Sequence, residues 1–304
     1  MKKTKFKSGY VTLLGKPNVG KSTILNYFLG QKLSIISAKP QTTRDAIMGI
    51  YSENNCQIIF TDTPGVHVPK TKLGECMMSQ ASQAAQDADL LVIILDAASG
   101  ITTADQEIFK LIKNKKMLGK YVWSCVLINK IDLIKKNQIF PLLDQARQYL
   151  AVDEFIPVSG LSGKNLDVVF EKIKKSLRPG PAFYPEDQLT DKNERFIVAE
   201  LIREQVLNLC HEEIPHSVAV EIQALKNNPG RKTLIQATIF LERQAQKKII
   251  IGKQGQMLKN IGTAARKKIE EFLQRSIFLE LWVKVHTHWR KDSAFLRRLG
   301  YEIK

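Results

Sequence analysis

The sequence predicts an α/β fold in which a mostly parallel sheet is followed by a smaller α+β domain. Through the first 178 of its 304 residues, short apolar runs alternate with helical patterns. This alternation is typical of parallel strands joined by helices. The segment Arg178-Pro179-Gly180-Pro181 breaks the alternation, and a different order of elements follows it. We therefore expect a first domain at 1–178, a linker at 179–188 and a second domain at 189–304.

In the first domain the apolar runs predict strands at 10–14, 46–51, 57–61, 90–95, 121–128 and 155–158. Helical patterns fall at 21–29, 74–86, 103–116, 138–149 and 165–177. Parallel strands place their carboxyl ends at one edge of the sheet, where open α/β folds bind ligands. The loops after these strands are therefore the first place to look for a site.

In the second domain an amphipathic helix is predicted at 193–210, with an apolar inner side that includes Phe196, Val198, Ile202 and Leu209. Strands follow at 217–225 and 233–242, joined by a turn at Asn228-Pro229-Gly230. The run 247–251 then leads into Gly252-Lys253-Gln254-Gly255, followed by a helix at 256–274 and a strand at 277–285. The expected order is α-β-β-α-α-β, with G-x-x-G between two helical pieces.

Composition limits the class of protein. The net charge of +16 is concentrated at the end of the chain, because residues 226–304 hold 18 Lys+Arg against 6 Asp+Glu. Such a segment suits a polyanionic partner. The 4 cysteines show no C-x-x-C spacing, which favours reduced thiols inside a core. No apolar run approaches the ~18 residues of a membrane span. We expect a soluble intracellular protein, for which contact with a membrane surface stays open.

A phosphate-binding loop is predicted where the strand at 10–14 meets the helix at 21–29. The segment Gly15-Lys16-Pro17-Asn18-Val19-Gly20-Lys21-Ser22 fits G-x-x-x-x-G-K-[ST] in the strand–loop–helix setting that this motif needs. Its backbone N–H groups would cradle phosphate at the positive end of the helix dipole. Lys21 would reach the β- and γ-phosphates, and the Ser22 hydroxyl would ligate Mg²⁺. Candidate nucleotide-binding residues of this loop are Gly15, Asn18, Val19, Gly20, Lys21, Ser22 and Thr23.

Asp62-Thr63-Pro64-Gly65 follows the strand at 57–61. Asp62 can hold Mg²⁺ through water, and the Gly65 N–H can sense the γ-phosphate. One threonine of Gln41-Thr42-Thr43-Arg44 should close over the nucleotide and complete the metal shell, and Thr43 is favoured over Thr42 on family spacing. The expected metal ligands are Ser22, Thr43 and Asp62.

Two further segments predict that the bound base is guanine. A carboxylate at Asp132 of Asn129-Lys130-Ile131-Asp132 can accept both N1–H and the 2-amino proton of guanine, and adenine offers no such pair. Lys130 would lie along the base, Asn129 would tie loops together, and a backbone N–H at Ser159 or Gly160 would face O6. The predicted ligands are therefore GTP and GDP with Mg²⁺.

The catalytic group for hydrolysis is less evident. The position after Gly65 is Val66, where many GTPases carry a water-orienting glutamine. His67 is more simply a bystander, so Lys21, Thr43 and Gly65 are the expected catalytic contributors. Asn18 suggests a K⁺ ion beside the phosphates, in the role of an arginine finger.

Residues around Gly252 and Gly255 predict RNA binding. The element order with G-x-x-G is that of a type II KH domain, whose loop clamps single-stranded RNA along its backbone. Lysines around the loop would neutralise phosphates, and the apolar run Ile249-Ile250-Ile251 would form a groove for bases. A plain helix–helix turn with a solvated basic face is the structural alternative. Candidate RNA contacts are Lys248, Ile251, Gly252, Lys253, Gln254, Gly255 and Lys259. The stretch 289–298 either extends this footprint or is an exposed basic helix.

Together these motifs resemble the bacterial Era family over nearly the whole chain. The matching segments are 15–22, 41–44, 62–65, 129–132, 248–255, Ile261-Gly262, Ala265-Arg266 and the ending 289–301. One departure is Gly160, where relatives commonly carry alanine. The resemblance implies a P-loop GTPase domain followed by a KH domain in a monomeric protein of the cytoplasm. It also implies a role in assembly of the small (30S) ribosomal subunit, contact with the 3′ region of 16S rRNA, and peripheral association with the inner membrane.

Two other functions fit parts of the sequence. The chain could be an RNA-binding module with a vestigial nucleotide site, although Lys21, Ser22, Asp62 and Asp132 are all present. A tRNA-modifying GTPase would be expected to carry its GTPase domain inside a helical domain and to end in a catalytic cysteine. This chain ends Tyr301-Glu302-Ile303-Lys304 instead.

Overall fold

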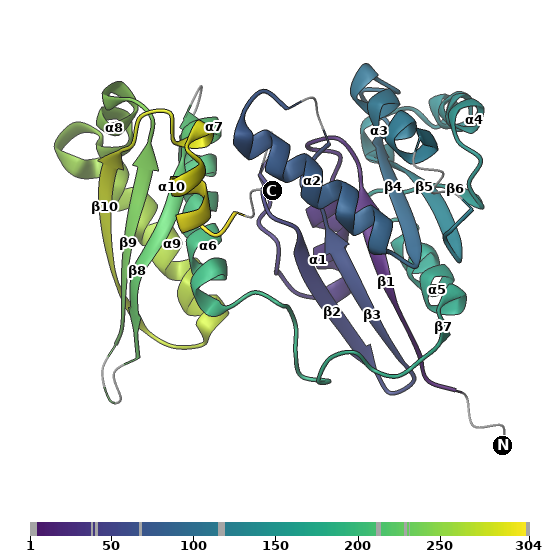
Figure 1. Cartoon of the computed structure of the whole chain (residues 1–304), viewed down its shortest axis with the longest axis horizontal. Coiled ribbons are helices and arrows are strands. Elements are labelled where there is room, and N and C mark those ends of the chain that lie inside the picture. The colour runs from purple at the N-terminus through teal and green to yellow at the C-terminus, as the bar shows by residue number, and fades with distance from the viewer. Residues whose placement is uncertain are drawn as a thin grey trace. The chain divides into compact units, whose positions relative to one another are not determined.

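The computed structural model describes residues 5–37, 39, 42–66, 69–114, 119–210, 214–227, 230 and 232–301 (Figure 1). Gln41, His67, Asn228 and Pro229 therefore lie outside the described residues. The chain divides into two compact units. The first comprises Met1–Ser34, Thr43–Lys70 and Met77–Asp191, and the second comprises Ile35–Thr42, Thr71–Cys76 and Lys192–Lys304.

The first unit is built on one mostly parallel sheet with the strand order β2-β3-β1-β4-β5-β6. Its strands are β1 (Lys7–Leu14), β2 (Ile47–Glu53), β3 (Cys56–Asp62), β4 (Leu90–Asp96), β5 (Trp123–Asn129) and β6 (Glu154–Pro157). Among the described strands of this sheet, only β2, which pairs with β3, and the short β7 (Arg178–Pro179), which pairs with β1, are antiparallel. The strands β3 and β5 are buried along their whole length. Their continuous apolar sequences reflect this burial on two faces.

Helices cover both faces of this sheet (Figure 1). Residues of α1 (Lys21–Leu29) and α5 (Leu166–Ser176) share one core cluster with β1, β3 and β5. Residues of α2 (Lys72–Asp87), α3 (Thr103–Asn114) and α4 (Ile139–Tyr149) share the other. Two short 3₁₀ turns, η1 (Ile131–Leu133) and η2 (Lys136–Gln138), lie between β5 and α4. The predicted doubly covered α/β sheet is confirmed.

The stretch expected to be a linker runs along the first unit. Gly180 N donates to Phe6 O, and the side chain of Gln57 bonds the backbone at Phe183 and Tyr184. Further along, Ile50 N donates to Leu189 O. The chain passes from the first compact unit to the second between Asp191 and Lys192. The domain limits at 178 and 188 stay predictions.

The second unit holds a sheet of order β10-β9-β8, in which β8 is antiparallel and β10 parallel to β9. Its elements are α6 (Glu194–Leu209), α7 (Ile214–Ser217), β8 (Ala219–Lys226), β9 (Thr233–Leu241), α8 (Gln244–Ile251), η3 (Lys253–Gly255), α9 (Gln256–Leu273), β10 (Ile277–Val285), η4 (Trp289–Lys291) and α10 (Ser293–Arg298). Apart from the short α7, this is the expected α-β-β-α-α-β order with G-x-x-G between α8 and α9.

The first helix is found where it was predicted, and Val198 and Ile202 are buried as expected, but its predicted amphipathic pattern is wrong. In α6, every residue from Leu201 to Leu207 is buried, including Arg203 and Glu204, whereas Phe196 and Leu209 are only half-buried. The helix packs against β8 and α9, and its charged residues bond the segment Ile35–Thr42 of the same unit. A helix covered on several sides has no solvent stripe, so the 3.6-residue pattern fails.

The C-terminal residues pack onto the second unit. The Trp289 side chain is fully buried, and its Nε1 donates to Ser217 O at 2.8 Å. The ring of Phe295 in α10 lies 5.0 Å from that of Phe240 in β9. Trp289 and Phe295 therefore belong to the core, while Arg298 pairs with Glu221.

The remaining sequence expectations concern thiols and membrane spans. The side chains of Cys56, Cys76, Cys125 and Cys210 are buried thiols that form no disulfide among the described residues, and burial raises the pKa of Cys210 to about 11. Within the described ranges, no helix combines the length and apolar character required to cross a bilayer.

Candidate functional site

The predicted nucleotide segments meet at one edge of the first sheet. Gly15–Gly20 follows β1, Asp62 ends β3, Asn129 ends β5, and Ser159 follows β6. Since these strands are parallel, their carboxyl ends lie together, which is why residues 110 positions apart share hydrogen bonds.

Close packing explains the glycines of the phosphate loop. A Cβ on Gly15 would lie 2.6 Å from Ile94 O, and one on Gly20 would lie 2.3 Å from Asn129 Nδ2. Gly20 also has a φ of 99°, and Asn18 has a φ of 63°. These left-handed residues turn the chain sharply before α1, which begins at Lys21. The loop thus has the bend and the helix N-terminus of a phosphate cradle.

The three expected metal ligands lie together. Ser22 Oγ donates to Asp62 Oδ2 at 2.6 Å, and Thr43 Oγ1 lies 3.0 Å from Ser22 Oγ and 3.4 Å from Asp62 Oδ2. Asp62 Oδ1 is buried and has no hydrogen-bond partner within the described chain. Two hydroxyls and one carboxylate, whose Oδ1 is unsatisfied, fit Mg²⁺. This ion takes few protein ligands and completes its shell with phosphate and water.

Thr42 lies differently from Thr43. Its hydroxyl donates to Lys39 O at 2.6 Å, within its own segment. The geometry therefore favours Thr43 as the metal ligand, as the family spacing does.

Opposite charges are buried at this edge. Lys21 is 5% exposed and Asp62 is 0% exposed. Desolvation lowers the pKa of Lys21 to about 8, against the attraction of Asp62. Desolvation likewise raises the pKa of Asp62, opposed by Lys21 and by the hydroxyls of Ser22 and Thr43. Lys21 Nζ donates to the carbonyl oxygens of Gly15 and Lys16 at 3.0 and 2.9 Å. A bound phosphate beside Lys21 and a bound cation beside Asp62 would each place an opposite charge next to a buried group and so favour its ionised form.

The base-recognition segments are joined by Asn129. Its Nδ2 donates to Val19 O at 2.7 Å, and its Oδ1 accepts from Gly160 N at 2.8 Å. One side chain therefore links the phosphate loop to the loop after β6. A Cβ on Gly160 would lie 3.3 Å from Ile24 Cγ1, so alanine would fit here only tightly.

Lys130 immediately precedes η1, and Asp132 lies within it. Asp132 Oδ1 accepts a hydrogen bond from Ser159 Oγ, which restrains the carboxylate. Lys130 has a left-handed backbone, with φ of 65°, and its Nζ pairs with Asp96 Oδ2 at 2.7 Å. Thr23 immediately follows Ser22 in the first turn of α1.

The segment after Asp62 is packed against the phosphate loop. A Cβ on Gly65 would lie 2.6 Å from both Cγ and N of Pro17, so only glycine permits this approach. Val66 N donates to Gly15 O at 3.2 Å, and the Val66 side chain, 2% exposed, joins the core with α2 and α3. Valine at this position serves packing, consistent with the expectation that it does not orient water.

Sequence reasoning missed two contacts at this edge. Asp96 fixes Lys130, and Lys16 Nζ donates to Asp105 Oδ2 at 2.8 Å and to the hydroxyls of Ser99 and Thr102. Asp96 could have been found, because it ends a predicted strand at the same edge. The Lys16 contact depends on how α3 is placed, which no motif signals.

In the second unit the G-x-x-G loop has the backbone that its glycines suggest. Gly252 and Gly255 have φ of 72° and 78°. A Cβ on Gly252 would lie 2.7 Å from Met257 Cβ, whereas Gly255 has open space around it. Lys248, Lys253, Gln254 and Lys259 are exposed near this loop, where a phosphate backbone could approach them.

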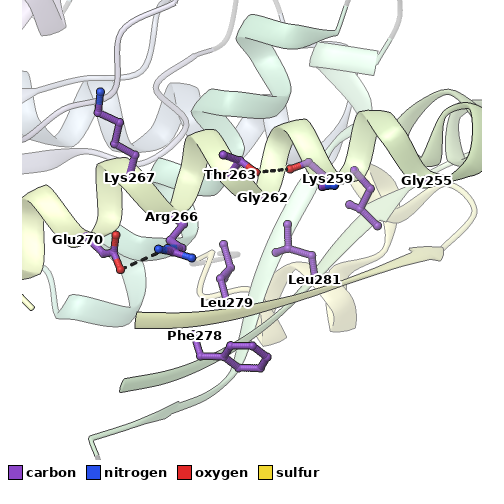
Figure 2. Close-up of a pocket in the computed structure, with 11 residues that line it drawn as sticks. Gly255, Lys259, Gly262, Thr263, Arg266, Lys267, Glu270, Phe278, Leu279 and Leu281 are labelled. Carbon is purple, nitrogen blue, oxygen red and sulfur yellow. Dashed lines mark hydrogen bonds and ion pairs between the residues drawn. The ribbon is translucent and has the colours of Figure 1, made fainter. Parts of the chain in front are cut away.

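A groove of about 650 Å³ runs from this loop between α9 and β10. Gly255, Leu258, Lys259 and Gly262 line it near the loop, and Thr263, Arg266 and Leu281 line it further along. Figure 2 shows Leu279 and Leu281 reaching from β10 toward α9, with Phe278 on the other side of the strand. At the far end Arg266 Nε lies 3.3 Å from Glu270 Oε1.

The expected groove along Ile249–Ile251 is not the one found. Ile250 is 0% exposed and belongs to the core. None of the three isoleucines lines the groove, whose apolar wall comes from α9 and β10 instead. Successive residues of a helix point in different directions, so an apolar run there does not form one continuous surface. The run alone therefore does not locate a binding surface.

Comparison with known proteins identifies both units. Residues 10–130 match the family described as 50S ribosome-binding GTPase, and residues 213–290 match the KH domain family. GTPase Era of Syntrophus aciditrophicus (strain SB) is 45% identical over 297 residues, which cover 97% of this chain and 95% of that protein.

Two solved Era structures share the fold. A point variant of Aquifex aeolicus Era bound to GDP·AlF4⁻ matches with a TM-score of 0.91 at 42% identity, covering 97% of this chain and 99% of that one. Era in complex with MgGDPNP and nucleotides 1506–1542 of 16S ribosomal RNA matches with a TM-score of 0.92 at the same identity and coverage. The chain belongs to the Era family of GTPases, with a P-loop GTPase domain followed by a C-terminal KH domain.

Proposed function

We propose that the protein is a GTP-hydrolysing switch that binds the 3′ region of 16S rRNA during assembly of the small ribosomal subunit. The convergence of Ser22, Thr43 and Asp62 beside the phosphate loop carries this proposal for the nucleotide. The basic G-x-x-G loop, with its groove along α9, supports RNA as the second ligand. A solved Era binds MgGDPNP together with a fragment of 16S rRNA.

The chain's own groups suggest how hydrolysis proceeds. The amides between Gly15 and Ser22 would hold the phosphates, and Lys21 would leave its two carbonyl partners to reach the β- and γ-oxygens. Ser22, Thr43 and Asp62 would hold Mg²⁺, which supplies positive charge beside these oxygens. The Gly65 N–H would report whether the γ-phosphate is present, and loss of that phosphate would release the segments at Thr43 and Gly65.

Guanine would be selected by Asp132, which Ser159 orients. Val19 and Gly160, linked by Asn129, would keep the phosphates and the base at a fixed separation. Asn18, Gly20 and Thr23 would complete the nucleotide contacts, with Lys130 along the base.

The cell context follows from the family and the charge. We propose a monomeric cytoplasmic protein that associates peripherally with the inner membrane. An RNA-binding module with a vestigial nucleotide site remains the alternative, and measurable GTP turnover by purified protein would exclude it.

Asp132→Asn tests guanine recognition. The amide should present a donor toward guanine N1–H, so GTP affinity should fall about 10- to 100-fold, the effect of losing a charge-assisted pair. Xanthine nucleotide should bind better than to the unaltered protein, because xanthine carries a carbonyl at the 2-position. Asp144→Asn, on the exposed face of α4, is the control. Unchanged discrimination against xanthine in Asp132→Asn would contradict the assignment.

Gly255→Asp tests the RNA groove. No atom lies within 4 Å of the added Cβ, and the strain of a side chain at the φ of 78° is shared by the control below, so the difference between the two variants reports the added charge. RNA containing the 3′ region of 16S rRNA should bind more than tenfold more weakly, since the carboxylate repels phosphates. GTP turnover of the free protein should not change. Gly230→Asp, also with positive φ and open space, is the matched control. Equal RNA affinity in both variants would place RNA elsewhere.

Coupling between the sites is tested by titrating the same RNA in GDP and in a non-hydrolysable GTP analogue. A switch requires different affinities in the two states, and RNA must then change nucleotide affinity by the same factor. Identical RNA affinities would remove the switch while leaving two separate binding activities.

A K⁺ ion beside Asn18 is proposed to assist hydrolysis. Replacing K⁺ with Na⁺ at constant ionic strength should slow GTP turnover severalfold. Asn18→Gly, which tolerates the φ of 63°, should lose this dependence. The same turnover in both salts would rule the ion out.

A further inference from the structure

The proposed RNA binding does not explain why α6 carries charged side chains in buried positions. Arg203 and Glu204 are 2% and 1% exposed, and neither lines the groove between α9 and β10. Ionised side chains are rarely buried without a specific partner, because desolvation is costly. Their partners therefore indicate what these residues do.

Both residues hold the segment Ile35–Thr42, which belongs to the same compact unit as α6. Arg203 Nη2 donates to the main-chain oxygen of Thr42. Glu204 Oε1 accepts from the main-chain nitrogen of Ile36 at 3.0 Å. The segment is thus bonded near its two ends, through backbone atoms, by adjacent residues of one helix.

A third residue fixes the direction of Arg203. Glu200, one turn earlier in α6, accepts from Arg203 Nε at 2.7 Å and also from Nη2. This two-pronged pairing orients the guanidinium plane, so Nη2 reaches the Thr42 oxygen in a fixed position. The Thr42 hydroxyl bonds Lys39 O, which further restrains the peptide between Thr42 and Thr43.

We propose that Arg203, assisted by Glu204, is a positioning residue for the magnesium site. The Thr42 carbonyl belongs to the peptide bond that leads directly into Thr43, whose hydroxyl lies 3.0 Å from Ser22 Oγ. Holding this peptide sets where the Thr43 hydroxyl lies, and hence how well the three metal ligands match an octahedral ion.

This proposal rests on the proposed GTP switch and names a physical route for it. The helix α6 packs against α9, and α9 lines the groove assigned to RNA. An adjustment of α9 on binding RNA can therefore act on Arg203, and through Thr42 on Thr43. By reciprocity, metal-bound nucleotide that fixes Thr43 would favour one placement of α6.

The test measures release of a fluorescent GTP analogue as a function of Mg²⁺ concentration. The variant is Arg203→Met combined with Glu200→Gln, which removes both members of the ion pair and leaves the hydrogen bond between Glu204 and Ile36 in place. The Mg²⁺ concentration that half-maximally slows release should rise about tenfold, the effect of one lost charge-assisted hydrogen bond. Release in excess chelator should not change, because the phosphate and base contacts are intact.

Arg195→Met is the matched control, since Arg195 is an exposed arginine of the same helix. Arg203→Lys keeps the buried charge, and should shift the Mg²⁺ midpoint in the same direction by a smaller factor, because an ammonium lacks the planar fork. RNA binding by each variant checks that the second unit is folded.

The outcomes separate the two proposals. If the unaltered protein shows no Mg²⁺-dependent retention of guanine nucleotide, the proposed function itself fails. If it does, and both Arg203 variants keep its Mg²⁺ midpoint, the positioning role is overturned and the nucleotide switch stands.

Discussion

The buried pair of Lys21 and Asp62 is the constraint around which the site is arranged. Asp62 ends β3, and Lys21 begins α1 after the loop that follows the adjacent parallel strand β1. Burial disfavours the charge on each, and their mutual attraction offsets only part of this cost. A phosphate beside the ammonium and a divalent cation beside the carboxylate would offset the rest of this cost.

The site also needs a fixed distance between the phosphate loop and the loop after β6. Asn129 sets this distance with two hydrogen bonds, one to each loop. The glycines at 15, 20 and 65 contribute sterically, because a Cβ there would lie within 2.6 Å of Ile94 O, Asn129 Nδ2 and Pro17 N, respectively. The site is therefore a set of backbone turns that few side chains hold together. Turns of this kind expose backbone N–H groups, which suit a ligand recognised largely through phosphate oxygens.

Local chemistry explains what the sequence could reveal. The helix α1 and the strand β10 were predicted to the residue, because a strong loop or turn signal bounds each of them. The proposed metal ligands Ser22 and Asp62 belong to recognisable motifs, and the structure brings their side chains together with that of Thr43. Thr43 was favoured over Thr42 on family spacing, and the different hydroxyl contacts of the two residues support that proposal.

Long-range packing explains what the sequence could not reveal. Arg203 and Glu204 occupy buried positions of α6 because they bond partners more than 160 residues earlier, so a pattern based on polarity places that helix but misassigns its buried residues. Ile250 was misread for a related reason, as an apolar run does not say which of its residues faces the core. The groove along α9 combines residues from two elements, and no single motif contains them.

Calorimetric titration of metal-supplied protein with GDP and with ADP tests the central claim most directly. The account predicts that GDP binds and that ADP binds at least about 100-fold more weakly, because adenine leaves the Asp132 carboxylate unpaired. Equal affinity for the two nucleotides would contradict it.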